Sequence, residues 1–192
     1  MEEPIVQKKK GNSSVETATA KKKSCVNQTL KDDIMKLCGN SDPPHEMLTS
    51  FLLNMICQDK YDIEVILVTS IISLACFVNE LNTADKKTEM AKISSFCKSL
   101  KPLVNGPDQQ LTLLNALQES LVTEKLQRGS LLRWFMTLYE EEVIDEEVFL
   151  EWKEMVDPRY EGKGEALIQV NKWLTWLEEA EEGSEEEEEE EG

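Results

Sequence analysis

The sequence lacks the features that mark membrane-spanning or secreted proteins. It has no run of about twenty apolar residues, the length that a membrane-spanning helix needs. The nearest approach, residues 63–78, is shorter and contains Glu64 and Thr69. The first residues, MEEPIVQKKKGNSS, lack the apolar stretch of a secretory signal peptide. We therefore expect residues 63–78 to form a buried helix, no membrane partner, and a protein that stays in the cytoplasm.

Residues suited to catalysis or metal binding are also scarce. His45 is the only histidine, which leaves little basis for Ser-His or Cys-His catalysis or for a multi-histidine metal site. The five cysteines, at positions 25, 38, 57, 76 and 97, never approach a Cys-x-x-Cys spacing, so we expect free thiols that pack as small apolar residues. Glycine-rich phosphate loops and hydrolase motifs are missing as well. The sequence therefore favours a protein that is no enzyme and needs no metal or cofactor.

Charge is plentiful but unevenly distributed. Residues 1–31 hold seven lysines against three glutamates, whereas residues 140–191 hold 22 acids against four bases. Blocks of like charge are usually disordered interaction tails. Nucleic acid is a poor partner for the acidic end, because phosphate binding needs positive charge. The net charge of −17 also favours a monomer.

Between the charged ends, apolar residues recur at helical spacing and no stretch alternates as a strand would. The pattern predicts seven or eight helices, with Asp62, Asp108, Ser130 and Asp145 as N-caps. The expected organisation is a disordered lysine-rich leader at residues 1–30, an all-α domain at 31–180 and a disordered acidic tail at 181–192. Composition alone leaves open whether the helices form a closed bundle or a HEAT-like stack of antiparallel pairs.

Two segments near the C-terminus resemble a known family. LLRWFMTLYEEEVIDEEVFLEWKEM, residues 131–155, is followed by GKGEALIQVNKWLTWLEEAEE, residues 162–182. Together they are similar to the C-terminal two-tryptophan domain of translation initiation factor four-gamma, initiation factor five and the epsilon subunit of initiation factor two-B. The amino-acid sequence of the second segment is most similar to the death-associated protein five branch of the four-gamma group. The resemblance implies a HEAT-like stack of helix pairs.

The resemblance also implies two acidic/aromatic boxes that bind partner proteins, the first from Leu138 through Trp152 and the second from Trp173 to Glu182. In the family these boxes contact lysine-rich segments of other initiation factors, above all initiation factor two beta. In the four-gamma branch the region also docks a mitogen-activated-kinase-interacting kinase. The candidate partner-binding residues carried over are Tyr139, Glu140, Glu141, Glu142, Glu146, Glu147, Trp152, Trp173, Trp176, Glu178, Glu179, Glu181 and Glu182.

The helical wheel separates the tryptophans. Trp173 falls within the apolar stripe of its helix and is expected in the core, while Trp176 lies roughly 60° away at the border, where one ring face can meet a partner. Trp152 is in step with Val148 and Met155, so we expect it in the core rather than at a contact. For the acids, a solvated helix face is the alternative to a binding site. Exposed ion pairs contribute only about 0 to 1 kcal/mol each, so aromatic anchors would have to supply much of the affinity.

The leader carries Lys8-Lys9-Lys10 and Lys21-Lys22-Lys23, two lysine triplets of the kind that an acidic box attracts. We hypothesise that the leader binds the boxes as an internal competitor. A solvated linker and a bipartite nuclear-import signal are the alternatives.

Other functions stay open at this point. The related domain of initiation factor two-B promotes guanine-nucleotide exchange, so an exchange activity on initiation factor two is one alternative. A short chain of this type, whether a fragment or a short paralogue, could also sequester partners of a longer factor. A generic acidic chaperone of basic proteins is a third reading, and it would tolerate loss of the tryptophans.

Overall fold

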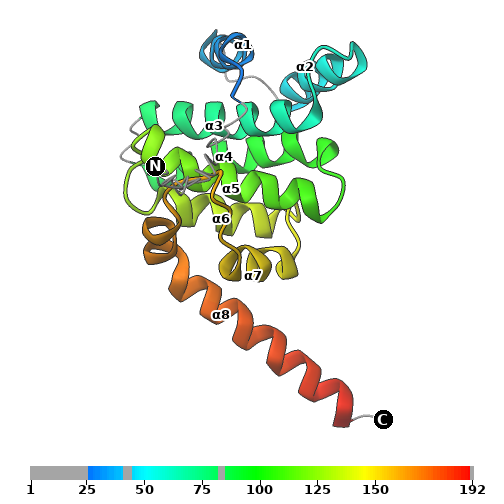
Figure 1. Ribbon diagram of the computed structural model, residues 1–192, viewed down its shortest axis with the longest axis vertical. Coiled ribbons are helices and arrows are strands. Elements are labelled where there is room, and N and C mark those ends of the chain that lie inside the picture. The colour runs from blue at the N-terminus through cyan, green and yellow to red at the C-terminus, as the bar shows by residue number, and fades with distance from the viewer. Residues whose placement is uncertain (1–25, 41–44, 82–84, 191–192) are drawn as a thin grey trace, which may run out of the picture.

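The chain forms a layered stack of helices, as Figure 1 shows. The computed structural model describes residues 26–40, 45–81 and 85–190. In these residues it has eight α-helices, one 3₁₀ turn and no strand. The elements are α1 (Gln28–Asn40), α2 (His45–Cys57), α3 (Ile63–Leu81), α4 (Lys86–Leu100), η1 (Lys101–Leu103), α5 (Pro107–Thr123), α6 (Ser130–Glu140), α7 (Glu146–Glu154) and α8 (Lys163–Glu190).

The helices pack in two parallel rows. Helices α1, α3, α5 and α7 contact one another in succession along one side, and α2, α4, α6 and α8 do so along the other. Each helix therefore packs mainly on the second helix before it and the second after it, with α1 and α8 at opposite ends (Figure 1). This confirms the all-α, HEAT-like prediction over the closed-bundle alternative.

Helix α3 is the centre of the core. It packs on α1, α5, α4 and α2, and its residues from Ile66 to Cys76 are buried on every side. A helix that is apolar all round belongs in a protein interior or a membrane. By length and composition α3 would suffice to cross a membrane, but in this fold its apolar surface is covered by other helices. The buried helix expected at residues 63–78 is confirmed and extends to Leu81.

Two of the four predicted N-caps are wrong. Helix α5 is preceded by Gly106 with Pro107 in its first turn, so Asp108 lies inside the helix. Gly129 precedes α6, and the Ser130 hydroxyl is buried without a hydrogen-bond partner. Asp145 is the N-cap of α7, yet its carboxylate accepts from the Gln110 side chain instead of capping the helix. The N-cap positions of α5 and α6 are occupied by glycine because the backbone there has a positive φ, 93° at Gly106 and 82° at Gly129.

The predicted ends of the domain shift in the structure. Helix α1 already begins at Gln28, and Asn27 accepts a hydrogen bond from the Leu30 amide as a helix cap does. Residues 1–25, with both lysine triplets, lie outside the described residues. Helix α8 continues to Glu190, whereas disorder was predicted from residue 181. Glutamate has a high helix propensity, and a helix that is already packed extends without a new nucleation step.

Among the described residues, the cysteines follow the core prediction with one exception, and Cys25 lies outside these residues. Cys38, Cys76 and Cys97 are buried and form no disulfide with another described residue. Burial is the main cause that raises the pKa of Cys76 to about 12 and that of Cys97 further still. Cys57 is exposed instead, because it is the last residue of α2 and lies beyond the packed part of that helix.

Candidate functional site: an acidic and aromatic surface on helices six to eight

An aromatic cluster joins the last three helices. Phe135 of α6 meets Trp152 of α7 edge to face, with ring centroids 5.0 Å apart. Trp173 of α8 packs in the same geometry on Phe149 at 5.0 Å and on Tyr139 at 5.9 Å. Each such aromatic pair adds about 0.5–1.5 kcal/mol beyond the area it buries. The cluster therefore fixes α8 against α6 and α7, and through Tyr139 and Trp173 it joins the two predicted boxes directly.

Trp152 is part of this core and not of the surface. Its exposed fraction is 0%. The Lys163 ammonium covers its ring at 3.3 Å from the centroid and donates a hydrogen bond to the Trp152 carbonyl oxygen. Desolvation lowers the pKa of Lys163 to about 8. The carried-over role of Trp152 as a partner contact is therefore corrected, and the expectation from the helical wheel that it is a core residue is confirmed.

The first predicted box, residues 138–152, spans the end of α6, the turn after it and most of α7, and its acids are in different environments. Glu141 accepts a hydrogen bond from the Ser94 hydroxyl and pairs with Lys98 at 3.4 Å. Glu142 has a positive φ of 52° and pairs with Lys101 at 3.1 Å. In the part of the chain that the structure describes, Glu140 and Glu147 are exposed and have no ion pair.

Tyr139 and Glu146 are held together at the edge of the same turn. The Tyr139 hydroxyl donates to Glu146 Oε2 at 3.2 Å. Desolvation, and then the nearby Glu146 charge, raise the pKa of Tyr139. Both side chains are partly buried, so they shape the edge of the site and orient its acids more than they offer free surface.

Trp176 is the exposed aromatic residue of the second predicted box. It stands on α8 three residues after Trp173, and 54% of its surface is exposed. Trp173 is only partly buried, so the border position predicted for one tryptophan applies in part to both. An exposed indole beside a packed aromatic cluster can bury one face against a partner without disturbing the core.

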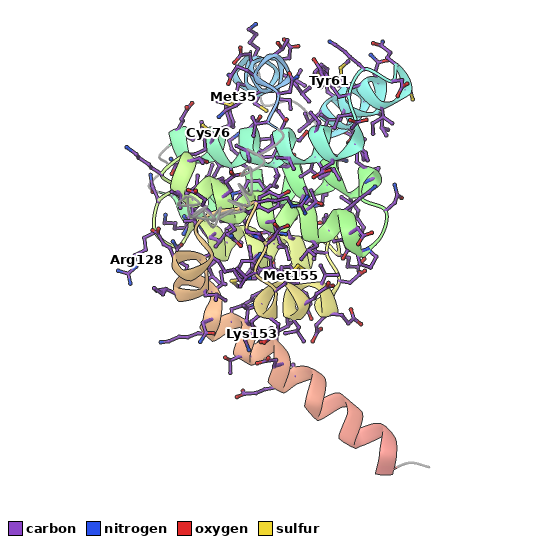
Figure 2. All side chains as sticks on the ribbon, viewed as in Figure 1. Met35, Tyr61, Cys76, Arg128, Lys153 and Met155 are labelled. Carbon is purple, nitrogen blue, oxygen red and sulfur yellow. The ribbon has the colours of Figure 1, made fainter. Side chains whose placement is uncertain are left out.

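The acids of the second predicted box divide in the same way as those of the first. Lys153 donates to both carboxylate oxygens of Glu178 at 2.6 Å, and Figure 2 labels Lys153 where α7 meets α8. Glu179 is exposed and has no ion pair among the described residues. The backbones of Glu181 and Glu182 are helical, but their side chains lie outside the described ones.

The lysines that pair with the boxes could not be predicted from the sequence. Lys98, Lys101 and Lys153 contact acids 43, 41 and 25 residues away. Helical periodicity places residues on faces of one helix, but it does not say which helices become neighbours. Among the described residues no group of three or more His, Cys, Asp or Glu side chains is arranged to hold a metal ion.

Comparison with known proteins finds similarity in the region of the site. Residues 109–189 match the family model described as W2: eIF4-gamma/eIF5/eIF2-epsilon. The match begins within α5 and covers α6, α7 and almost all of α8, which are the helices that carry the aromatic cluster and both boxes. The W2 family model therefore matches the C-terminal helices of this chain.

Individual relatives agree with that match. The chain is 39% identical over 104 residues to eukaryotic translation initiation factor 4 gamma 2 of Mus musculus, which is 52% of this chain and 12% of that protein. It is 48% identical over 84 residues to eukaryotic translation initiation factor 4 gamma 3 of Homo sapiens, covering 42% of this chain and 5% of that protein. With initiation factor 4 gamma 1 of Mus musculus it shares 28% identity over 115 residues, 59% of this chain and 7% of that protein. The chain spans only a small part of the length of these relatives.

Proposed function

We propose that the surface formed by α6, α7 and α8 docks lysine-rich segments of translation initiation factors, with the lysine-rich segment of initiation factor two beta as the first candidate. The observation that carries the proposal is the half-exposed Trp176, which stands about one helical turn after Trp173 on α8. The contact of Trp173 with Tyr139 joins the two boxes. We define this docking surface by Tyr139, Glu140, Glu147, Trp173, Trp176 and Glu179. The match of residues 109–189 to the W2 family model and the similarity to initiation factors support the choice of partner.

Magnitudes favour the tryptophan as the main anchor. Full burial of an aromatic side chain removes about 150–250 Å² from water, so covering the exposed half of Trp176 is worth at most about 2–3 kcal/mol at about 25 cal/mol per Å². Each exposed ion pair adds only about 0 to 1 kcal/mol. Several acids must therefore act together to match one indole, and their main effect is on association rate and on salt dependence.

Calorimetric titration with the lysine-rich segment of initiation factor two beta, at about 0.1 M salt, tests the proposal. We expect binding by the wild-type chain and a loss of about tenfold or more in affinity for Trp176→Ala, since central aromatic anchors are often worth more than about 2 kcal/mol. Ile168→Ala is the matched control, because Ile168 is also on α8 and is 79% exposed. Absence of wild-type binding, or an equal loss in both variants, refutes the proposal.

Two further assignments belong to the same proposal. We propose that the chain is related to the death-associated protein five branch of the four-gamma group, because the amino-acid sequence of residues 162–182 resembles that branch. Docking of a mitogen-activated-kinase-interacting kinase through the same surface is the second candidate, and it is to be tried if the lysine-rich segment does not bind. In either case the chain would compete with longer factors for the same partners.

Guanine-nucleotide exchange on initiation factor two is the alternative activity. A nucleotide-release assay on the GDP-loaded factor separates it from docking alone. Acceleration above background supports exchange, and binding without acceleration supports the docking function proposed here.

A further inference from the structure

The turn that follows α6 already holds two ammonium groups. Lys101 of η1 donates to the main-chain oxygen of Glu141 at 2.9 Å and to Glu142 Oε2 at 3.1 Å. Lys98 of α4 approaches Glu141 Oε1 at 3.4 Å. Two of the five candidate acids of the first box, Glu141 and Glu142, are therefore paired with lysines of the same chain.

This turn is built to receive a cation. Glu141 is the C-cap of α6, where unpaired carbonyl oxygens and the helix dipole favour positive charge. The positive φ of Glu142 belongs to the tight turn, in which the Val143 and Ile144 amides donate back to the Leu138 oxygen. One Lys101 ammonium thus meets a carboxylate and a helix-end carbonyl at once, as an incoming lysine would.

The two lysines are arranged so that a ligand could displace them. Their side chains are 50% and 46% exposed for Lys98 and Lys101, so the ammonium groups can move into solvent without unpacking the core. Lys153 of the second box differs, because its side chain is only 20% exposed and it ties α7 to α8 through both oxygens of Glu178.

We propose that Lys98 and Lys101 are built-in competitors for the first box. In the free protein they occupy Glu141 and Glu142, and a lysine-rich ligand gains those two acids only by displacing them. The inference rests on the proposed docking function and adds the residues that set its affinity. Weak binders then contact Glu140, Glu147 and Trp176 alone, while ligands with more lysines can also engage the turn. The pair thus selects for lysine density in the partner.

Titration of the full chain with a short oligolysine peptide, at about 0.1 M salt, tests this inference. Lys98→Gln with Lys101→Gln is expected to tighten binding about three- to tenfold, the range that two freed exposed ion pairs allow. Lys36→Gln with Lys87→Gln is the matched control: it removes the same charge from exposed positions in α1 and α4 and is expected to change affinity less than about twofold. A thermal melt confirms that each variant is folded.

A double-mutant cycle separates local competition from long-range charge. Glu141→Gln with Glu142→Gln is measured in the wild-type background and in the Lys98→Gln/Lys101→Gln background, and we expect a larger loss of affinity in the second because only there are the two acids free. Equal losses of affinity in both backgrounds overturn the inference, and so does a Lys98→Gln/Lys101→Gln variant that binds no more tightly than the control pair. In either case, binding by the wild-type chain still upholds the docking function. Wild-type chain that binds no oligolysine at all overturns both.

Discussion

Trp152 and Trp176 stand in similar acidic surroundings in the sequence but have opposite roles in the structure. Trp152 is fully buried against Phe135, whereas Trp176 is half exposed. We predict that Trp152→Ala lowers the free energy of unfolding by about 3–5 kcal/mol through the cavity it leaves. Trp176→Ala should lower it by less than about 0.5 kcal/mol, as for other surface changes. Urea denaturation of both variants measures this, and similar values for the two would contradict the burial pattern.

Gly162 is a second position where one side chain decides stability. Its φ is +86°, and an added Cβ would lie 2.8 Å from Val122 Cγ2 and 3.2 Å from the Gln118 carbonyl oxygen. We predict that Gly162→Ala destabilises the fold by about 1–3 kcal/mol through backbone strain and this contact. Gly164→Ala, two residues later in α8 with open space around it, is the control and should be neutral or stabilising by up to about 1 kcal/mol. Thermal unfolding compares the two, and a stable Gly162→Ala would rule out the tight approach of the α7–α8 loop to α5.

At the scale of single elements, α8 combines a packed segment with an acidic extension. Its buried residues Ala166, Val170, Leu174 and Leu177 all precede residue 180. A chain ended after Glu182 should therefore keep the melting temperature of the full chain within a few degrees, because it loses no core contact among the described residues. Its affinity for a lysine-rich peptide should fall at low salt and approach that of the full chain at high salt, since screening removes the contribution of distant charges. A difference in affinity that persists at high salt would mean that residues 183–192 make direct contacts.

The boundaries of the helices show which parts of the fold can be predicted from the sequence alone. Apolar periodicity located the helices from α2 onwards, and Trp152 and Leu174 fell on the predicted core faces. The predicted N-caps at Asp108 and Ser130 were wrong, because a glycine with positive φ can start a helix at a sharp turn without any side-chain cap. Helix α1 was partly missed, since its apolar residues Leu30, Ile34 and Cys38 follow the polar leader without a composition break.

At the scale of the whole molecule, the stack separates α1, the first described helix, from α8 of the docking surface. Helix α1 lies at one end and α8 at the other (Figure 1), three layers apart, or about 25–30 Å at roughly 8–10 Å for each layer. An extended chain covers at most about 3.6 Å per residue. Lys23, three residues before Val26, cannot span that distance, whereas Lys10 can.

The hypothesis of an internal competitor in the leader therefore becomes specific. We predict that Lys8-Lys9-Lys10 changed to glutamine tightens binding of oligolysine at low salt, and that the same change at Lys21-Lys22-Lys23 does not. The two variants remove equal charge, so each controls for the other in the same titration. Deletion of residues 1–25 should act like the first variant, and the cut must stop there because Asn27 caps α1 and donates its amide to Thr69. Equal effects of the two triplets would refute the reach argument.

The acidic and aromatic residues of the two boxes could be named from the sequence, but their burial and pairing could not. The two boxes and their aromatic residues could be named from residues 131–155 and 162–182, and the structure joins them through the contact of Tyr139 with Trp173. Their occupation by Lys98, Lys101 and Lys153 depends on which helices become neighbours in the stack, and that information is absent from the local pattern. Under the proposed docking function, these lysines set which acids a partner can reach.

The most direct test of the docking surface is to follow the four tryptophan indole N–H signals by NMR while a lysine-rich peptide is added. We predict that the signal of Trp176 shifts most and that of Trp173 shifts less. The signals of Trp134 and Trp152, both fully buried, should stay in place. Shifts confined to backbone amides away from α6, α7 and α8, with Trp176 unmoved at saturation, would contradict the proposed docking surface.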